Sequence, residues 1–344
     1  MCLPSLSYLC KIAIVLLVGG LGEEEIAKAQ FHQRNHGDIH NKLLPYLTVS
    51  VDQSGHANFS TIQSAIDSVP SNNKHWVLIN VKAGIYREKL KIPYEKPYII
   101  LKGEGKRNTL VDWDDHATTS QSPTFSTMAD NVVVKSISFR NSYNNPRNSN
   151  PIEPAVAAMV SGDKSYFYDV GFYGLQDTLW DDQGRHYYKF CTIQGAVDFI
   201  FGAGQSLYEG CSISVVGASL DPGYVGFITA QGRTNLNDAN GFVLKNCKIF
   251  GNGTTFLGRP WRGYARVLFY NTSMSNVILP TGWDPWNFNH HENRVTFAEY
   301  KNFGPGSNIS LRVKWSKKLS LATIKSMIST KFIDNEGWLK AQDF

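Results

Sequence analysis

Two aspartates spaced 21 residues apart are the side chains of this sequence best suited to catalysis. Asp198 stands in the run QGAVDFIFGAG (194–204), among mostly apolar and small residues. An ionised carboxylate in such surroundings is costly unless it is paired, and its pKa rises if it is not. Asp177 lies 21 residues earlier, in FYGLQDTLW (172–180). Two close carboxylates push their pKa values apart, so one can act as nucleophile or base and the other as acid.

A cation should keep Asp198 ionised, and FLGRPW (256–261) offers Arg259. This arginine lies between a glycine and a rigid proline, so its backbone is constrained. Bidentate pairing with the carboxylate would lower the pKa of Asp198. Trp261, two residues later, gives a flat apolar face on which a sugar ring can stack. From spacing alone, an Asp–Arg bridge that only orders the packing of the chain remains an alternative.

The elements that must position these residues are short β-type runs that repeat about every 20 residues. Repeats of this length with one or two strands each are typical of a solenoid whose coils stack into a continuous core. We predict an all-β, right-handed parallel β-helix with short flanking helices near 59–70 and 320–333. A β-sandwich is the alternative, while propeller repeats would be about twice as long. Spacings of 21, 20 and 36 residues, the last holding an insertion, separate the phase-matched positions Phe172, Ile193, Ile213 and Ile249.

This period places the two aspartates on neighbouring coils. Stacked strands lie ~4.8 Å apart. Asp177 and Asp198 occupy the same phase of the repeat, so they should face each other on one side of the solenoid, with Gln176 beside them.

The N-terminal residues indicate export. Lys11 precedes the apolar run IAIVLLVGGLG, and Ala27-Lys28-Ala29 supplies a small-x-small cleavage site. We expect a signal peptide at 1–29, a flexible segment at 30–45 and one catalytic domain at 46–344. Later apolar runs are too short to span a membrane, so no membrane contact is expected after signal removal. Glycosylation is expected at the N-x-S/T sequons of Asn58, Asn252, Asn271 and Asn308.

Charge favours an acidic polysaccharide as partner. The chain has 34 Lys and Arg against 29 Asp and Glu, a formal net charge of +5. A basic exported protein suits a polyanion, and no long Lys/Arg run marks a nucleic-acid-binding tail. An ordinary fluctuation of composition is the alternative explanation.

We expect no metal and no cofactor. The three cysteines beyond the signal have no C-x-x-C spacing, and their odd number leaves at least one thiol free. His32, His36 and His40 fall in the expected flexible segment, and the acidic cluster DWDDH (112–116) is interpreted as a surface turn rather than a Ca²⁺ site.

Several stretches resemble the plant pectinesterases (pectin methylesterases), which share the right-handed parallel β-helix. The resemblance runs from about Leu47 to Leu339, and no inhibitor-like pro-region of the kind many plant members carry is visible. QDTL, DFIFG and LGRPW together are highly specific. The matching stretches are GIYREK (84–89), SGDKSYFY (161–168), GLQDTLW (174–180), GAVDFIFG (195–202), TAQGR (229–233), LGRPW (257–261), GWDPW (282–286) and EYKNFGPG (299–306).

The resemblance implies roles for matched positions. Asp198 would be the nucleophile that attacks the methyl-ester carbonyl of galacturonate. Asp177 would protonate the departing methanol and then activate the hydrolytic water. Gln176 would donate a hydrogen bond to the developing oxyanion, and Arg259 would hold Asp198. The implied lining of the sugar cleft is Trp261, Phe125, Phe199 and Trp283.

The sequence departs from the family pattern in two places. Pro154 occupies the position where the family usually has a second oxyanion glutamine, and proline has neither an amide side chain nor a backbone N–H. Val170 stands where a cysteine is common, which leaves Cys191 as the free thiol. Cys211 and Cys247 match a pair that the family often bridges by a disulfide.

We therefore expect a cofactor-free carboxylic-ester hydrolase, secreted to the plant cell wall and acting as a monomer on methyl-esterified homogalacturonan. A proteinaceous pectinesterase inhibitor is a candidate partner, and nucleic acid is not. One alternative is a pectin glycosidase or lyase on the same solenoid, because two aspartates can also flank a glycosidic bond. Another, motivated by Pro154, is a pectin-binding wall protein with weak or no catalysis.

Overall fold

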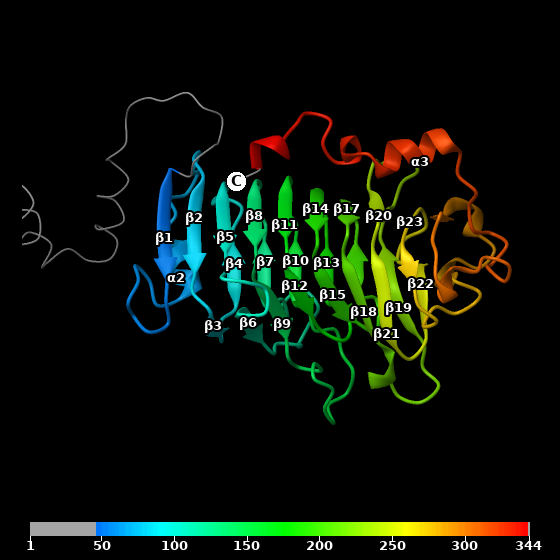
Figure 1. Cartoon of the computed structure of the whole chain (residues 1–344), viewed down its shortest axis with the longest axis horizontal. Helices are drawn as coiled ribbons and strands as arrows, with labels where there is room; N and C mark the ends of the chain where they lie inside the picture. Colours follow the sequence, from blue (N-terminus) through cyan, green and yellow to red (C-terminus); the bar gives the residue numbers. More distant parts are fainter. Residues whose placement is uncertain (1–45, 343–344) are drawn as a thin grey trace, which may run out of the picture. The chain divides into compact units, whose positions relative to one another are not determined.

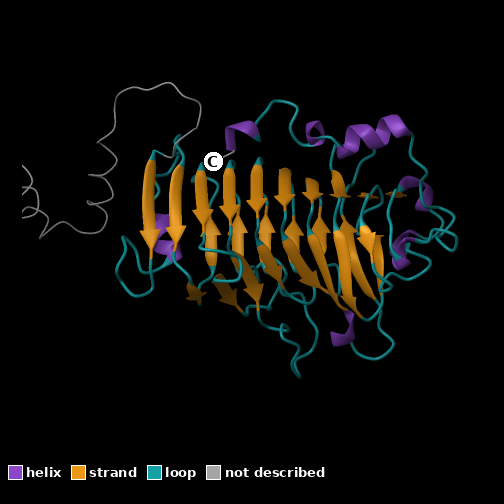
Figure 2. Cartoon of the chain, in the orientation of Figure 1, coloured by secondary structure: helices purple, strands orange, loops and turns teal. Residues whose placement is uncertain are grey.

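Three parallel sheets wind around a common core in the computed structural model, which describes residues 46–342 (Figure 1). The expected signal peptide, most of the segment after it and its three histidines lie outside the described residues. Strands dominate, and the few helices are short and peripheral (Figure 2). Within the described part, no helix has the length and apolar character needed to cross a membrane.

Each sheet collects strands from successive coils. The order of sheet A is β1 (Leu47–Val51), β2 (Val77–Val81), β5 (Ile99–Lys102), β8 (Val132–Lys135), β11 (Ser165–Tyr168), β14 (Arg185–Lys189), β17 (Gln205–Glu209), β20 (Gly241–Lys245), β23 (Arg266–Tyr270) and β25 (Thr296–Tyr300). Sheet B contains β3 (Gly84–Tyr86), β6 (Thr109–Trp113), β9 (Ser138–Asn141), β12 (Gly171–Tyr173), β15 (Thr192–Gly195), β18 (Ser212–Val216), β21 (Lys248–Asn252) and β24 (Ser273–Met274). Sheet C contains β4 (Leu90–Ile92), β7 (Phe125–Thr127), β10 (Ala158–Val160), β13 (Leu179–Asp181), β16 (Ile200–Gly202), β19 (Gly226–Gln231) and β22 (Thr255–Pro260).

This is the predicted right-handed parallel β-helix. The phase-matched positions of the sequence are consecutive partners in sheet B: Phe172, Ile193, Ile213 and Ile249. The spacing found in the sequence therefore predicts correctly which residues of neighbouring coils lie opposite one another. Each β-type run of the sequence, however, forms two strands. In most coils the chain bends between sheets A and B at a left-handed residue, such as Asp169 with a φ of 53°. The β-sandwich and the propeller are thereby excluded.

Short helices flank the coils where the periodicity placed them. Helix α2 (Ile62–Asp67) begins at Thr61, whose hydroxyl accepts a hydrogen bond from the Ser64 N–H. Helix α3 (Leu321–Ile328) and the 3₁₀ turn η5 (Thr330–Phe332) belong to a C-terminal segment that packs on sheet A. Shorter 3₁₀ turns are η1 (Gly217–Ser219), η2 (Trp286–Phe288), η3 (Glu292–Arg294), η4 (Pro305–Ser307) and η6 (Lys340–Gln342).

Stacked side chains fill the interior, because equivalent positions of neighbouring coils lie directly above one another. Phe167 stacks on Tyr188 with ring centroids 4.9 Å apart, and Tyr188 stacks on Tyr208 at 4.6 Å. Such ring pairs stabilise the core beyond the area they bury.

The cysteines also stack, and this corrects the predicted disulfide. Cys191, Cys211 and Cys247 precede equivalent strands of sheet B and are buried free thiols. The Sγ of Cys211 donates to the Tyr188 carbonyl, and that of Cys247 donates to the Tyr208 carbonyl. Each thiol thus finds a backbone acceptor on the preceding coil, and the Cys211–Cys247 bond is not formed.

A buried polar group ties three strands together inside the solenoid. The Asp181 carboxylate lies 2.5 Å from His186 Nδ1 and accepts the Tyr208 hydroxyl, while His186 Nε2 lies 2.9 Å from the Gly162 carbonyl. The side chains of Asp181 and His186 are completely buried. Removing one partner would leave the others without hydrogen bonds in a low-dielectric interior.

Asp181→Ala should therefore lower the free energy of unfolding by about 3–5 kcal/mol. The matched control is Asp182→Ala, which removes a partly buried carboxylate that accepts one hydrogen bond from Ser161 and should cost about 1 kcal/mol. Urea unfolding of both variants measures the difference. Equal costs would contradict the role assigned to the buried group.

Candidate active site

The two aspartates lie side by side at the turns that lead from sheet B to sheet C. Gln176 pairs with Val197 in an isolated parallel bridge, and the Asp177 N–H donates to the Val197 carbonyl at 3.0 Å. This register makes Asp177 and Asp198 equivalent residues of neighbouring coils, as the 21-residue spacing predicts. Both have left-handed backbones, with φ values of 60° and 46°, a conformation that aspartate tolerates better than most residues.

Arg259 reaches Asp198 from strand β22, two coils further along. Its Nε donates to Oδ1 at 2.9 Å and its Nη2 donates to Oδ2 at 2.5 Å, which is the predicted bidentate pair. The guanidinium lies between the rings of Phe227 and Trp286, 4.0 and 3.9 Å from their centroids. Stacking on both faces holds the guanidinium in place, so the carboxylate orientation is fixed.

Burial and charge separate the two carboxylic acids. Burial raises the pKa of Asp177 to about 8, and the negative charge of Asp198 adds to the shift. Burial also raises the pKa of Asp198, but the hydrogen bonds and charge of Arg259 oppose this rise. Since only Asp198 has the direct arginine contact, Asp198 is the group that ionises first. Near neutral pH the site therefore holds a carboxylate beside a carboxylic acid.

An aromatic cleft opens above these groups on the outward face of sheet C. Trp180 and Phe201 are stacked with centroids 5.4 Å apart, and Phe201 meets Trp261 edge-on at 5.9 Å. Such a lining suits a pyranose ring, whose C–H faces pack on aromatic surfaces. The cleft is lined by Thr119, Gln176, Asp177, Trp180, Asp198, Phe201, Ala230, Arg259, Trp261 and Trp286.

Three of the four predicted cleft residues are misplaced. Phe125, Phe199 and Trp283 are almost fully buried and do not line the cleft. Phe125 packs against Phe139, and Trp283 packs on Phe297 while its indole N–H donates to Glu299. Their side chains point to the interior, whereas Trp261 does line the cleft as predicted.

The missed lining residues follow the same period as the aspartates. Trp180, Phe201, Ala230 and Arg259 are successive partners in sheet C, so they form one outward row along the coils. The 21-residue step from Trp180 to Phe201 equals that from Asp177 to Asp198 and could have revealed this row. Trp286 and Thr119 lie in irregular segments, and no comparable signal in the sequence marks them.

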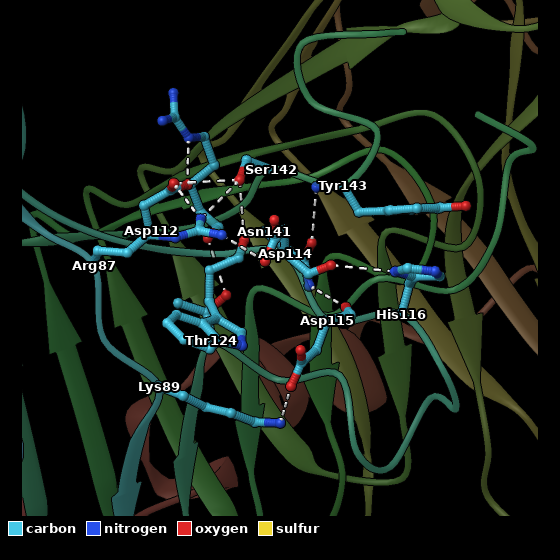
Figure 3. A network of polar contacts seen from close by, with 12 residues as sticks. Arg87, Lys89, Asp112, Asp114, Asp115, His116, Thr124, Asn141, Ser142 and Tyr143 are labelled. Atoms are coloured by element: carbon cyan, nitrogen blue, oxygen red, sulfur yellow. Dashed lines mark hydrogen bonds and ion pairs between the residues drawn. The ribbon is translucent and has the colours of Figure 1, made fainter. Parts of the chain in front are cut away.

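A polar network holds the chain segment that contains Asp112, Asp114 and Asp115 (Figure 3), and this segment leads to Thr119. Arg87 pairs with Asp112 at 2.9 Å and with Asp114 at 2.5 Å, and Lys89 contacts Asp115. Lys89 also donates to the Gln121 carbonyl. Each DWDDH carboxylate thus contacts a cation, and the network helps to position one wall of the cleft. The predicted surface turn is only partly confirmed, because Asp112 and Trp113 end strand β6 and Asp112 is buried.

The other predicted positions lie around the coils. The four sequon asparagines are exposed. Pro154 is partly buried just before β10, and the next residue, Ala155, donates its N–H to the Gln176 carbonyl at 3.2 Å. Proline therefore occupies the coil next to the candidate oxyanion glutamine without lining the cleft.

Comparison with known proteins shows that this chain is similar to pectinesterases. The family model described as Pectinesterase matches residues 48–337. Probable pectinesterase 29 of Arabidopsis thaliana is 63% identical over 296 residues, which cover 85% of this chain and 88% of that protein. The solved pectin methylesterase from carrot is 30% identical with a TM-score of 0.80, covering 89% of this chain and 98% of that one. A solved pectin methylesterase in complex with a hexasaccharide is 28% identical with a TM-score of 0.73, covering 83% and 97%.

The raised pKa of Asp177 has a consequence for stability. In the unfolded chain this residue ionises near its usual pKa of 3.8, whereas in the folded protein it keeps its proton up to about pH 8. The unfolded state therefore binds fewer protons in this window, and stability falls as pH rises through it. Asp177→Asn should abolish this dependence, leaving the variant more stable than the parent at neutral pH by up to a few kcal/mol and equal to it below about pH 4. Urea midpoints at the two pH values measure the difference, and a difference independent of pH would contradict the assignment.

Proposed function

The chain belongs to the pectinesterase family and is a carboxylic-ester hydrolase that acts on the methyl esters of pectin, and we propose that Asp198 and Asp177 carry out this reaction. The observation that carries the proposal is that the carboxyl groups of Asp198 and Asp177 have different surroundings. Asp198 is oriented and kept ionisable by two hydrogen bonds from Arg259, while Asp177 is partly buried beside it without a direct cation contact. One group can attack and the other can donate a proton.

In the first half-reaction, an Asp198 carboxylate oxygen attacks the carbonyl carbon of the ester. The side-chain amide of Gln176 donates a hydrogen bond to the oxyanion of the tetrahedral intermediate. The intermediate collapses with cleavage of the bond to the methoxy oxygen, and Asp177 transfers its proton to that oxygen, so methanol leaves. The products are an anhydride between Asp198 and the galacturonate, and an ionised Asp177.

In the second half-reaction, the ionised Asp177 takes a proton from water. The resulting hydroxide attacks the galacturonoyl carbon of the anhydride, and the bond to the Asp198 oxygen breaks. This step restores the Asp198 carboxylate and the Asp177 acid, and it leaves galacturonic acid, which loses its proton to solvent to give the free carboxylate. Because the reaction is completed by two carboxylic acids and water, no cofactor is needed.

The aromatic row is proposed to hold the polysaccharide. Trp180, Phe201 and Trp261 offer apolar faces on the same side as the aspartates. The related pectin methylesterase solved with a hexasaccharide supports an extended oligosaccharide as the ligand of such a cleft. We further propose that the protein acts as a monomer in the plant cell wall after removal of residues 1–29, with glycans on exposed sequons. A proteinaceous inhibitor is a candidate partner.

Methanol release from highly methylated pectin tests the proposal. The mature protein should release methanol without creating new reducing ends, which separates an esterase from a glycosidase or lyase. Asp198→Ala should lower kcat by at least about 10³-fold, since it removes the nucleophile. Asp182→Ala is the matched control, because it removes a carboxylate outside the cleft lining and should retain turnover. Unchanged turnover in the Asp198 variant would overturn the mechanism.

A second candidate function, pectin binding with weak catalysis, rests on Pro154. This position lacks the amide that would give a second donor to the oxyanion, and one such donor is worth about 10²–10³ in rate. Pro154→Gln should then raise kcat by about 10–100-fold with little change in KM. Pro154→Leu is the control, because it removes the proline ring without supplying an amide. Equal kcat values for the two variants would show that residue 154 does not contribute to oxyanion stabilisation.

A further inference from the structure

The last residues of eight successive strands of sheet A form one continuous row. Each is the register partner of the next, and neighbouring strands lie ~4.8 Å apart. We call this set the lysine–tyrosine row. From β5 to β25 it contains Lys102, Lys135, Tyr168, Lys189, Glu209, Lys245, Tyr270 and Tyr300.

This row lies on the outer face of sheet A beside the covered part of that face. The residues two positions earlier in the same strands, such as Tyr166 and Tyr187, pack under the C-terminal segment with Met327 and Trp338. In Figure 1 this segment, drawn in red, runs back across the strands from α3. Tyr270 packs against that cluster, whereas Lys102 is exposed and Tyr168 is 37% exposed. The other row residues are partly buried.

Lysines and tyrosines occupy seven of the eight positions of the row. Tyr270 stacks on Tyr300 with centroids 6.0 Å apart, and Lys135 lies 6.0 Å from the centroid of Tyr168. The turn residue after β14, Phe190, adds an exposed ring that Lys189 covers at 5.5 Å. Cations next to flat apolar rings are suited to a ligand that combines carboxylates with sugar rings.

Acidic residues offset only part of this charge. Among the row and the single residue that follows each of its strands, five are lysines and two are acidic. Both acidic side chains are paired. Glu209 contacts Lys245 at 2.8 Å, and Asp169 contacts Lys106, a lysine outside this set, at 2.8 Å.

The catalytic cleft has the opposite character. Its one lining cation among the described residues is Arg259, which is already bound to Asp198. The cleft thus suits a neutral, esterified sugar, while each turnover under the proposed function creates a carboxylate. The cleft and the lysine–tyrosine row thus lie on different sheets and differ in charge.

We propose that the lysine–tyrosine row is a second polysaccharide-binding site, which holds stretches of de-esterified galacturonan while the cleft works on esterified residues. The choice of ligand rests on the proposed function, and the row lies outside the reacting groups. A single exposed lysine–carboxylate contact is weak and screened by salt. Several contacts made in register along one polymer act together, so the site favours contiguous blocks of carboxylates over isolated ones.

Binding of fully de-esterified polygalacturonate tests the site, because this polymer has no methyl ester to hydrolyse. The row variant is Lys102→Gln/Lys135→Gln/Lys189→Gln. The matched control, Lys314→Gln/Lys318→Gln/Lys325→Gln, removes the same charge from exposed lysines outside the row. The row variant should bind at least about tenfold more weakly at low salt and with a smaller salt dependence, because multivalent contacts are lost. The control should bind like the parent protein.

Two results would overturn the proposal: retention of parental binding by the row variant, or an equal loss in the control variant. Tyr168→Ala provides a second readout. It should weaken binding of polygalacturonate but not of poly-L-glutamate, and equal effects on the two polymers would refute recognition of the sugar. Turnover of a short methyl-esterified oligogalacturonate should be unchanged in all these variants. An absence of turnover would count against the proposed function and leave the binding comparison intact.

Discussion

Parallel hydrogen bonding between coils is the constraint on which this structure depends. It holds equivalent residues of successive coils in register, so a residue type repeated at the coil period becomes a row on the surface or a stack in the core. The paired aspartates, the aromatic lining of the cleft, the buried thiols and the lysine–tyrosine row are all products of this one geometry. Their different properties follow from whether the row points inward or outward.

Electrostatics gives the aspartate row its chemistry. Two carboxyl groups at neighbouring coil positions and largely removed from water cannot both ionise easily, so one proton stays in the site. Arg259 decides which group keeps it, because its two hydrogen bonds stabilise the charge of Asp198 alone. The rings of Phe227 and Trp286 hold the guanidinium in that position. An ester hydrolase can thus be built from two residues of the same type.

The cleft on sheet C and the lysine–tyrosine row on sheet A differ in charge, so they suit different parts of the polysaccharide. The cleft on sheet C is aromatic and its single cation is engaged, which suits the neutral ester. The row on sheet A is rich in lysines, which suits the acidic product. Since pectin is a long chain whose charge changes as the reaction proceeds, two surfaces of different charge can contact different parts of one polymer.

The sequence alone determined the period, and with it the β-helix and the adjacency of Asp177 and Asp198, because register is a property of spacing. It also indicated the arginine that binds Asp198, through its constrained position in FLGRPW. Tertiary structure decided which side chains point outward. Phe125 and Phe199 are aromatic, like the residues that line the cleft, but they face the core. Trp180 and Phe201 face the cleft. It also decided that Cys211 and Cys247 remain separate thiols bonded to backbone carbonyls. Residue type does not specify whether a side chain at a bend of the coil faces the core or the solvent. That direction depends on the backbone conformation of the bend, including its left-handed residues, in the stacked coils.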